Sequence, residues 1–154
     1  MGCVDLPNLK LMGKVKPGDI QQGTLGDCWL LSGISAVAEF EGAIERLFRK
    51  TRNIQNLPGD EPNVYTVTLW DLQTWSEVDI VIDERLCAHP DGKKMLLGAK
   101  PSKDGQLWVP YLEKAIAALC GGYDKIEGGM CTHGEWKMCK ETYPIGSILT
   151  CFIL

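Results

Sequence analysis

The sequence contains no dense cluster of lysine or arginine, no Cys-x-x-Cys pair, and no amino-terminal apolar segment of the kind that directs secretion. Its 16 basic and 20 acidic residues give a formal net charge of −4. This balance gives no support to nucleic-acid binding or to a basic patch for membranes or phosphate. We therefore expect a protein or peptide partner, no nucleic acid and no membrane association.

The cysteines also lack the pattern of a disulfide framework. There are seven, an odd number without paired spacing, at positions 3, 28, 87, 120, 131, 139 and 151. Such a set favours a reducing compartment, so we expect an intracellular, cytoplasmic protein. The start Met1-Gly2-Cys3 resembles an acylation signal, but Leu6 stands where myristoylation prefers Ser or Thr.

Residues 22–39 predict a loop that leads into a helix, with Cys28 at the junction. After Gly26-Asp27, apolar residues recur at helical spacing, which predicts a helix. They are Trp29, Leu30, Ile34, Val37 and Phe40. In the first helical turn, unpaired N–H groups and the helix dipole stabilise a thiolate over a thiol. The alternative is that Cys28 is a small buried apolar side chain, the commonest role of a free cysteine.

Other segments predict one further short helix, a β-hairpin and a packing helix. Residues 43–50 carry the apolar pattern of the short helix, and residues 64–70 and 77–83 that of two antiparallel strands. Asp79 and Asp83 share one face of the second strand, either as a carboxylate pair or, as we prefer, as its solvated side. Residues 107–119 predict an amphipathic helix that ends at Gly121-Gly122.

Three segments resemble the calpain-type cysteine proteases, a papain-like family. The segment from Gln22 to Leu31, with Gly-Asp-Cys-Trp, resembles their nucleophile segment, in which a Gln six residues before the Cys supplies a side-chain amide to the oxyanion hole. The strand before Asp83-Glu84-Arg85-Leu86 resembles another family segment. A third likeness covers Trp108, Leu112-Glu113-Lys114-Ala115, Gly122-Tyr123 and Gly128-Gly129.

The resemblance implies an α+β fold, the first lobe of a papain-like cysteine protease of protist type. This helical lobe has a central helix headed by Cys28 and a small antiparallel sheet. On this basis we expect an extended N-terminal arm at residues 1–18 and the first lobe of the protease core at 19–145. Residues 146–154, an apolar run, would then begin a truncated second lobe.

The function implied by the resemblance is that of a calpain-like intracellular cysteine endopeptidase that attacks peptide bonds through a thiolate. Cys28 would be the nucleophile, and Gln22 an oxyanion donor. The family's Gly-His-Ala-Tyr-like and Asn-Pro-Trp-Gly-like segments, which carry its catalytic His and Asn, do not occur in this sequence. Neither His89 nor His133 stands where the resemblance places the base, so we expect this chain alone to be inactive, with the second protease lobe as its partner.

Two alternatives to proteolysis are open from the sequence. The chain would be a non-catalytic interaction or regulatory module if it binds a protein through the surface that a second lobe would cover. A thiol redox sensor at Cys28 is less favoured, because no resolving cysteine lies near it in sequence.

No cofactor is needed for thiolate chemistry, so metal sites are a separate question. Cys131, His133 and Cys139 offer only three zinc ligands without a recognised spacing. In the calpains the first lobe binds calcium through loop carbonyls and two carboxylates. Asp19 matches one of them, but Gln106 stands where the other, a Glu, is expected. Because a neutral amide removes a charge from such a site, we expect calcium binding to be weakened or lost.

Overall fold

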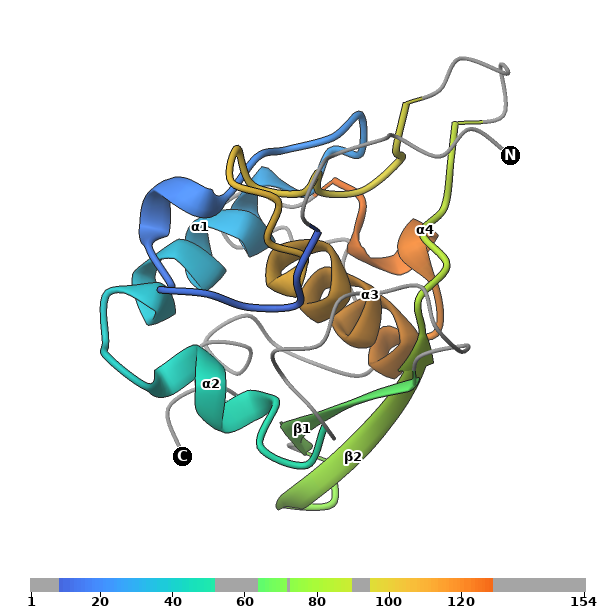
Figure 1. The fold of residues 1–154 in the computed structure, drawn as a ribbon. Helices are drawn as coiled ribbons and strands as arrows, with labels where there is room; N and C mark the ends of the chain where they lie inside the picture. Colours follow the sequence, from blue (N-terminus) through green and yellow to red (C-terminus); the bar gives the residue numbers. More distant parts are fainter. Residues whose placement is uncertain (1–8, 52–63, 72, 90–94, 129–154) are drawn as a thin grey trace.

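A computed structural model describes residues 9–51, 64–71, 73–89 and 95–128 of the chain (Figure 1). In these residues helices are combined with one two-stranded sheet, which confirms the predicted α+β fold. The elements in chain order are η1 (Pro17–Asp19), α1 (Cys28–Ala38), α2 (Ala43–Leu47), β1 (Val64–Asp71), β2 (Ser76–Asp83), α3 (Trp108–Cys120) and α4 (Tyr123–Ile126).

Helix α1 begins at Cys28, as its apolar spacing predicts. Its buried residues are Trp29, Leu30, Leu31, Ile34, Val37 and Ala38. The prediction was wrong for Phe40, which is 67% exposed. The helix ends at Ala38, so the helical periodicity that would have turned Phe40 inward does not continue to it.

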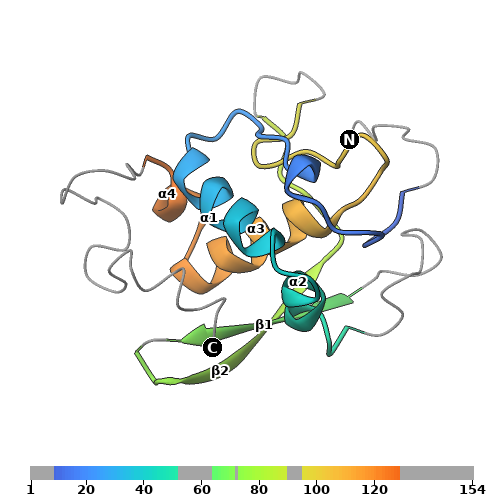
Figure 2. The ribbon, with the colours of Figure 1, turned by 90° about the vertical axis from the view of Figure 1, so that its left-hand side faces the viewer.

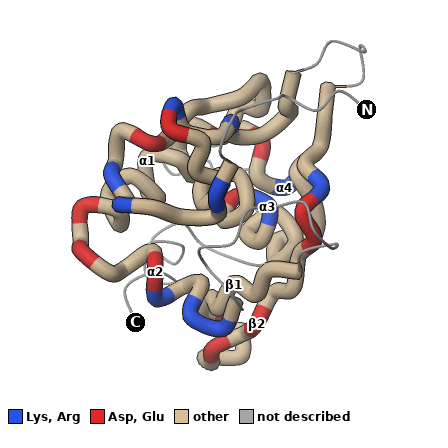
Figure 3. The backbone as a smooth tube through the Cα atoms, viewed as in Figure 1, with Lys and Arg blue, Asp and Glu red and all other residues tan. Residues whose placement is uncertain are grey.

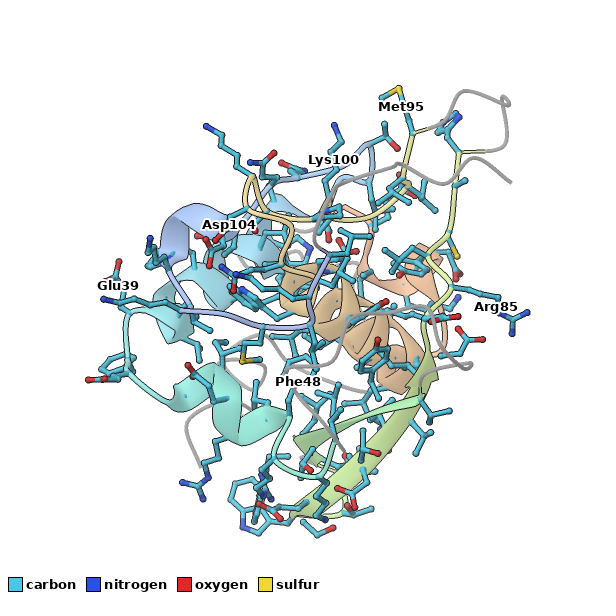
Figure 4. All side chains as sticks on the ribbon, in the orientation of Figure 1. Glu39, Phe48, Arg85, Met95, Lys100 and Asp104 are labelled. Carbon is cyan, nitrogen blue, oxygen red and sulfur yellow. The ribbon has the colours of Figure 1, made fainter. Side chains whose placement is uncertain are left out.

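Helix α2 is shorter than predicted and ends at Leu47 instead of residue 50. It follows Gly42, whose φ of 78° lies in the left-handed region that favours glycine. Ile44, Leu47 and Phe48 are buried, as the apolar pattern predicts. Phe48 therefore belongs to the core although it lies outside the helix, and Figure 4 shows it between α2 and the hairpin.

Strands β1 and β2 form the predicted antiparallel hairpin, in register from Val64 opposite Asp83 to Asp71 opposite Ser76. Its inward face contributes Val67 and Leu69 of β1 to the core. Asp79 is exposed and forms an ion pair with Lys50. Its outward position is that of a solvated face, as we preferred, whereas Asp83 is half-buried and forms an ion pair with Lys114 of α3.

Helix α3 connects the hairpin to the rest of the core. Its Tyr111 ring stacks on Tyr65 of β1 with a centroid distance of 4.4 Å. Its Lys114 lies 2.5 Å from the Asp83 carboxylate at the end of β2. The helix ends where predicted, at Gly121, whose φ is 95°. Both views place the hairpin at one end of the molecule, with α1 and α3 above it (Figure 1 and Figure 2).

The described part of the predicted N-terminal arm packs on the helices. Leu11 and Met12 are buried in the core, and Lys10 forms a β-bridge with Gln106 just before α3. The predicted second-lobe residues 146–154, together with Cys131, His133 and Cys139, lie outside the described residues.

Charged residues of both signs are interspersed along the described chain (Figure 3). Among the helices of the described segments, none has the length and apolar character that crossing a lipid bilayer requires.

Candidate functional site

Cys28 is the first residue of α1, and its side chain is exposed. The alternative of a small buried apolar side chain is therefore wrong. The next residue, Trp29, turns inward and is 5% exposed. Its indole N–H donates a hydrogen bond to the Ile126 carbonyl oxygen at the end of α4, across 3.1 Å. The buried Trp29 thus fixes the helix start that presents Cys28 to solvent.

Gln22 lies in the loop that leads from η1 to α1, and it too is exposed. Its side-chain nitrogen donates a hydrogen bond to the Leu25 carbonyl oxygen across 2.9 Å. A primary amide carries two N–H bonds, so this contact occupies one of them and leaves the second for another acceptor. The structure therefore places both predicted site residues, Gln22 and Cys28, on one exposed loop-to-helix junction.

Backbone hydrogen bonds hold this junction from two sides. On one side, the N–H groups of Thr24 and Leu25 donate to the Leu97 carbonyl oxygen, and Lys100 N–H donates to the Gln21 carbonyl oxygen. On the other side, Gly128 N–H donates to the Gly26 carbonyl oxygen across 2.8 Å. The exposed loop is therefore held to the rest of the fold by backbone hydrogen bonds on both sides.

Two glycines, Gly23 and Gly98, allow neighbouring segments of the chain to pack closely in this region. A Cβ atom on Gly23 would overlap the backbone carbonyl of Gly98, and a Cβ atom on Gly98 would overlap the carboxyl group of Glu113. The loop that carries Gln22, the segment at residues 97–99 and helix α3 thus lie in contact one behind another. Side chains larger than hydrogen would separate these three layers.

Two acidic side chains are fully buried behind Cys28. Asp27, which precedes α1, is 0% exposed, and Glu113 of α3 is 1% exposed. Both carboxyl oxygens of Glu113 accept the Ala99 N–H, at 2.9 and 2.8 Å. Within the described segments, no well-aligned N–H or hydroxyl donor reaches either oxygen of Asp27, although its own backbone N–H stabilises the carboxylate. The Asp27 carboxyl group instead lies beside that of Glu113, close enough for each to affect the pKa of the other.

The contact between these carboxyl groups requires a proton, because two carboxylates offer only acceptors. Burial, followed by the hydrogen bond and charge of Asp27, raises the pKa of Glu113 to about 9. Burial also raises the pKa of Asp27. The pair therefore holds at least one proton at neutral pH.

Sequence reasoning did not single out this pair as a functional feature. A signal was present, because Glu113 lies four residues after Val109 and three before Ile116, on an apolar stripe of α3. A carboxyl group on such a stripe has to find a buried partner. The partner could not be identified from spacing along α3, because Asp27 lies just before a different helix, α1.

Gln106 and Asp19, the two residues considered for calcium, do meet in the structure. Gln106 is 1% exposed, and its side-chain nitrogen faces three oxygens: the Lys14 carbonyl at 3.3 Å, Asp19 Oδ2 at 3.4 Å and Asp104 Oδ2 at 3.0 Å. Its side-chain oxygen accepts the Gly13 N–H across 2.7 Å. Figure 4 shows Asp104 in the loop before α3. The cluster is therefore centred on an amide N–H donor.

Asp19 receives further hydrogen bonds in this cluster. The Lys16 N–H donates to Asp19 Oδ2 across 2.9 Å, and the Trp108 indole N–H donates to the same oxygen across 3.4 Å. Within the described residues, no group of three or more His, Cys, Asp or Glu side chains is arranged to hold a metal ion.

Of the two histidines, His133 lies outside the described residues. His89 lies in the segment after β2, where its backbone N–H donates to the Met95 carbonyl oxygen. Figure 4 shows Met95 at the edge of the molecule.

Comparison with known proteins gives consistent matches. Residues 3–142 match the family described as calpain family cysteine protease. The calpain-2 catalytic subunit of Gallus gallus is 30% identical over 155 residues, which cover 88% of this chain and 21% of that protein. The calpain-type cysteine protease ADL1 of Oryza sativa subsp. japonica is 35% identical over 118 residues, which cover 77% of this chain and 5% of that protein.

Calpain-8 of Rattus norvegicus is 32% identical over 124 residues, which cover 80% of this chain and 16% of that protein. The chain thus spans about a fifth or less of the length of these three relatives.

Proposed function

Because the chain belongs to the calpain family of cysteine proteases, we propose that it is the nucleophile lobe of an endopeptidase and that Cys28 is the nucleophile. The observation that carries the proposal is the exposed Cys28 thiol at the first residue of α1. The N–H groups of a first helical turn favour an anion at this position. Its sulfur would attack the carbonyl carbon of a peptide bond in a protein substrate.

We propose that two N–H donors stabilise the oxyanion formed in this attack. One is the backbone N–H of Cys28, and the other is the second N–H of the Gln22 side-chain amide. The hydrogen bond from Gln22 to Leu25 supports this role, because it limits the rotation of the amide while leaving one N–H bond unused. The contacts of the loop with Leu97 and Gly128 keep the donors from moving apart.

No segment of this sequence matches the family segment that carries the general base. The family's catalytic His and Asn belong to segments that are absent from these 154 residues. We propose that the chain alone hydrolyses peptides negligibly and that a second lobe, as part of the same enzyme or as a partner, completes the site. A cytoplasmic location, proposed from the cysteine pattern, fits this chemistry because a free thiolate needs a reducing medium.

The test is to measure labelling of Cys28 by a peptidyl epoxide, located by mass spectrometry, with and without a separately expressed second lobe of a calpain. We expect slow labelling of the chain alone and a strong increase when the lobe is added. Cys28→Ala should remove all of the increase, whereas Cys87→Ala, at another exposed cysteine, should leave it intact.

Two outcomes would contradict the proposal. Turnover of a peptide by the chain alone, abolished by Cys28→Ala, would show that no second lobe is needed. Labelling that does not change when the lobe is added, together with tight binding of a different protein, would favour the non-catalytic interaction module.

We also propose that this lobe does not use calcium at the position of Asp19 and Gln106. The donor set does not fit the ion, because Gln106 directs N–H bonds, and not an oxygen, toward Asp19, Asp104 and the Lys14 carbonyl. Calcium requires oxygen ligands, which carboxylates, carbonyl groups and water supply. In this arrangement the Gln106 amide itself joins the oxygens that a cation would otherwise join.

A further inference from the structure

The buried pair of Asp27 and Glu113 has no part in the chemistry proposed for Cys28. A fully buried carboxyl group is rare and costly unless it is protonated or paired. Asp27 is also the residue just before α1, where an aspartate normally turns outward to accept N–H groups of the first turn. Here no side chain caps α1, and the Asp27 carboxyl points into the core instead.

Contacts lead from Glu113 to both sides of the loop-to-helix junction. In one direction, Glu113 meets Asp27, which is bonded covalently to Cys28. In the other direction, Glu113 accepts the Ala99 N–H and packs on Gly98. Gly98 in turn packs on Gly23, the neighbour of Gln22. One side chain of α3 thus contacts Asp27, next to the Cys28 donor, and the segment at residues 97–99, on which the Gln22 loop packs.

We propose that Glu113 is a positioning residue: in its protonated form it donates a hydrogen bond to Asp27 and accepts the Ala99 N–H, and so sets the distance between Cys28 and the Gln22 loop. The inference rests on the proposed function for its consequence in catalysis. The geometry favours this proton, because Asp27 and Glu113 are buried side by side and no well-aligned N–H or O–H donor from another described residue reaches the Asp27 carboxyl group.

Other titratable groups near the pair cannot replace this proton at neutral pH. Tyr123 of α4 is close enough that the charges of Glu113, Cys87 and Asp27 add to the effect of burial, which raises its pKa. The Tyr123 hydroxyl is therefore neutral throughout the range in which the pair titrates. The segment at residues 97–99 consists of Leu97, Gly98 and Ala99, so it brings no titratable side chain to the pair.

Loss of the shared proton would leave two carboxylates in contact inside the core. They would repel each other, and Asp27 would lose the donor that Glu113 supplies. We expect the junction to loosen first where it depends on Glu113, at the Ala99 N–H, and then at Thr24 and Leu25, whose N–H groups bind the adjoining Leu97. The oxyanion donors should therefore lose their alignment as the pH rises far enough to remove the shared proton.

The direct test is a titration of the 154-residue chain with ¹³C-labelled glutamate side chains, followed by NMR. The carboxyl carbon of Glu113, assigned by its loss in Glu113→Gln, should titrate above pH 7. Titration of Glu113 near the ordinary value for glutamate would overturn the inference, and this reading needs no catalytic activity.

The positioning role is tested by amide hydrogen exchange at Ala99, Thr24 and Leu25. Glu113→Gln keeps an N–H donor for Asp27 and an oxygen for Ala99, so we expect protection close to that of the original chain, but without its loss at alkaline pH. Glu113→Ala removes both contacts and should lower protection at all three amides by about tenfold or more. Glu41→Gln is the matched surface control and should change nothing.

Two results would contradict this role. One is equal protection of Thr24 and Leu25 in Glu113→Ala and the original chain. The other is an unchanged pH profile in Glu113→Gln. If Glu113→Ala does not fold, the comparison of Glu113→Gln with the original chain decides alone. Absence of peptidase activity after addition of a second lobe would count against the proposed function and leave this inference standing.

Discussion

The side-chain amide of Gln106 donates a hydrogen bond to the Asp104 carboxylate across 3.0 Å, while its oxygen accepts the Gly13 N–H across 2.7 Å. The second contact fixes the orientation of the amide, because exchanging its nitrogen and oxygen would set two N–H groups against each other. The nitrogen is therefore the atom that faces Asp19, which is 7% exposed.

Gln106→Glu should convert this cluster into a calcium site. The substitution replaces the N–H donor by a carboxylate facing Asp19 and Asp104, so three negative groups would then surround one position. Titration calorimetry should show calcium binding with a Kd on the order of 10⁻⁴ to 10⁻³ M. Without the ion the variant should melt below the original chain, because the carboxylates repel.

The control for this change is Gln21→Glu, which adds the same charge to a nearby half-buried position outside the cluster. It should bind no calcium in the same titration. Tight binding of calcium by the unaltered chain would contradict the proposed role of Gln106.

Gln22→Ala should lower kcat of the enzyme completed by a second lobe by about 10²-fold, because one oxyanion donor is lost. The KM should change little, since the donor acts on the transition state. Alkylation of Cys28 by iodoacetamide requires no oxyanion and should keep its rate. The matched control is Gln21→Ala, whose backbone, and not its side chain, binds Lys100. A loss confined to KM would contradict the assignment of Gln22.

Gly98→Ala should destabilise the chain by about 3 kcal/mol, because the added methyl group would overlap the buried carboxyl group of Glu113. Gly23→Ala should cost at least as much, since the obstacle there is the backbone of Gly98. Gly18→Ala meets no atom within 4 Å and should be neutral or slightly stabilising. Urea unfolding of the three variants measures these differences, and equal stability of Gly98→Ala and Gly18→Ala would contradict the close packing.

The stability of the chain should fall as the pH rises from about 4.5 toward 9. The folded chain keeps the Glu113 proton up to a pKa of about 9, whereas the unfolded chain releases it near the ordinary value of 4.5. Its stabilising contribution is therefore complete below pH 4.5 and is lost through this window, by about 1.4 kcal/mol per pH unit at most. Urea unfolding at several pH values measures the slope.

Glu113→Gln is the control for this slope, because an amide does not titrate. The difference in free energy of unfolding between the variant and the original chain should grow in favour of the variant with rising pH. A difference that stays constant from pH 5 to pH 9 would show that Glu113 is ionised in the folded chain.

Local patterns were sufficient to predict most of the described fold. The start of α1 at Cys28 follows from Gly26-Asp27 and the apolar spacing after it, and the end of α3 follows from Gly121. The exception, Phe40, shows that an apolar residue beyond a helix end is not placed by the helical period. Such residues depend on where the helix stops, which periodicity specifies poorly.

The candidate site was predictable only in part, because its residues depend on contacts between distant segments. Cys28 and Gln22 were identified from a short motif on one loop. The link from Asp27 to Glu113 spans two helices, and the fit of Gly23 on Gly98 depends on backbone approach. Neither spacing nor composition carries this information. The amide orientation at Gln106 likewise depends on the distant Gly13 N–H.

The inward direction of Asp27 has a consequence for helix α1 as a whole. An outward aspartate would accept N–H groups of the first turn and stabilise the helix by about 1 kcal/mol. Because α1 has no side-chain cap, the first N–H groups, including that of Cys28, keep their hydrogen-bonding capacity. The helix is thus less stable than a capped helix would be. In return, its first turn keeps unpaired N–H groups that can bind a negatively charged atom.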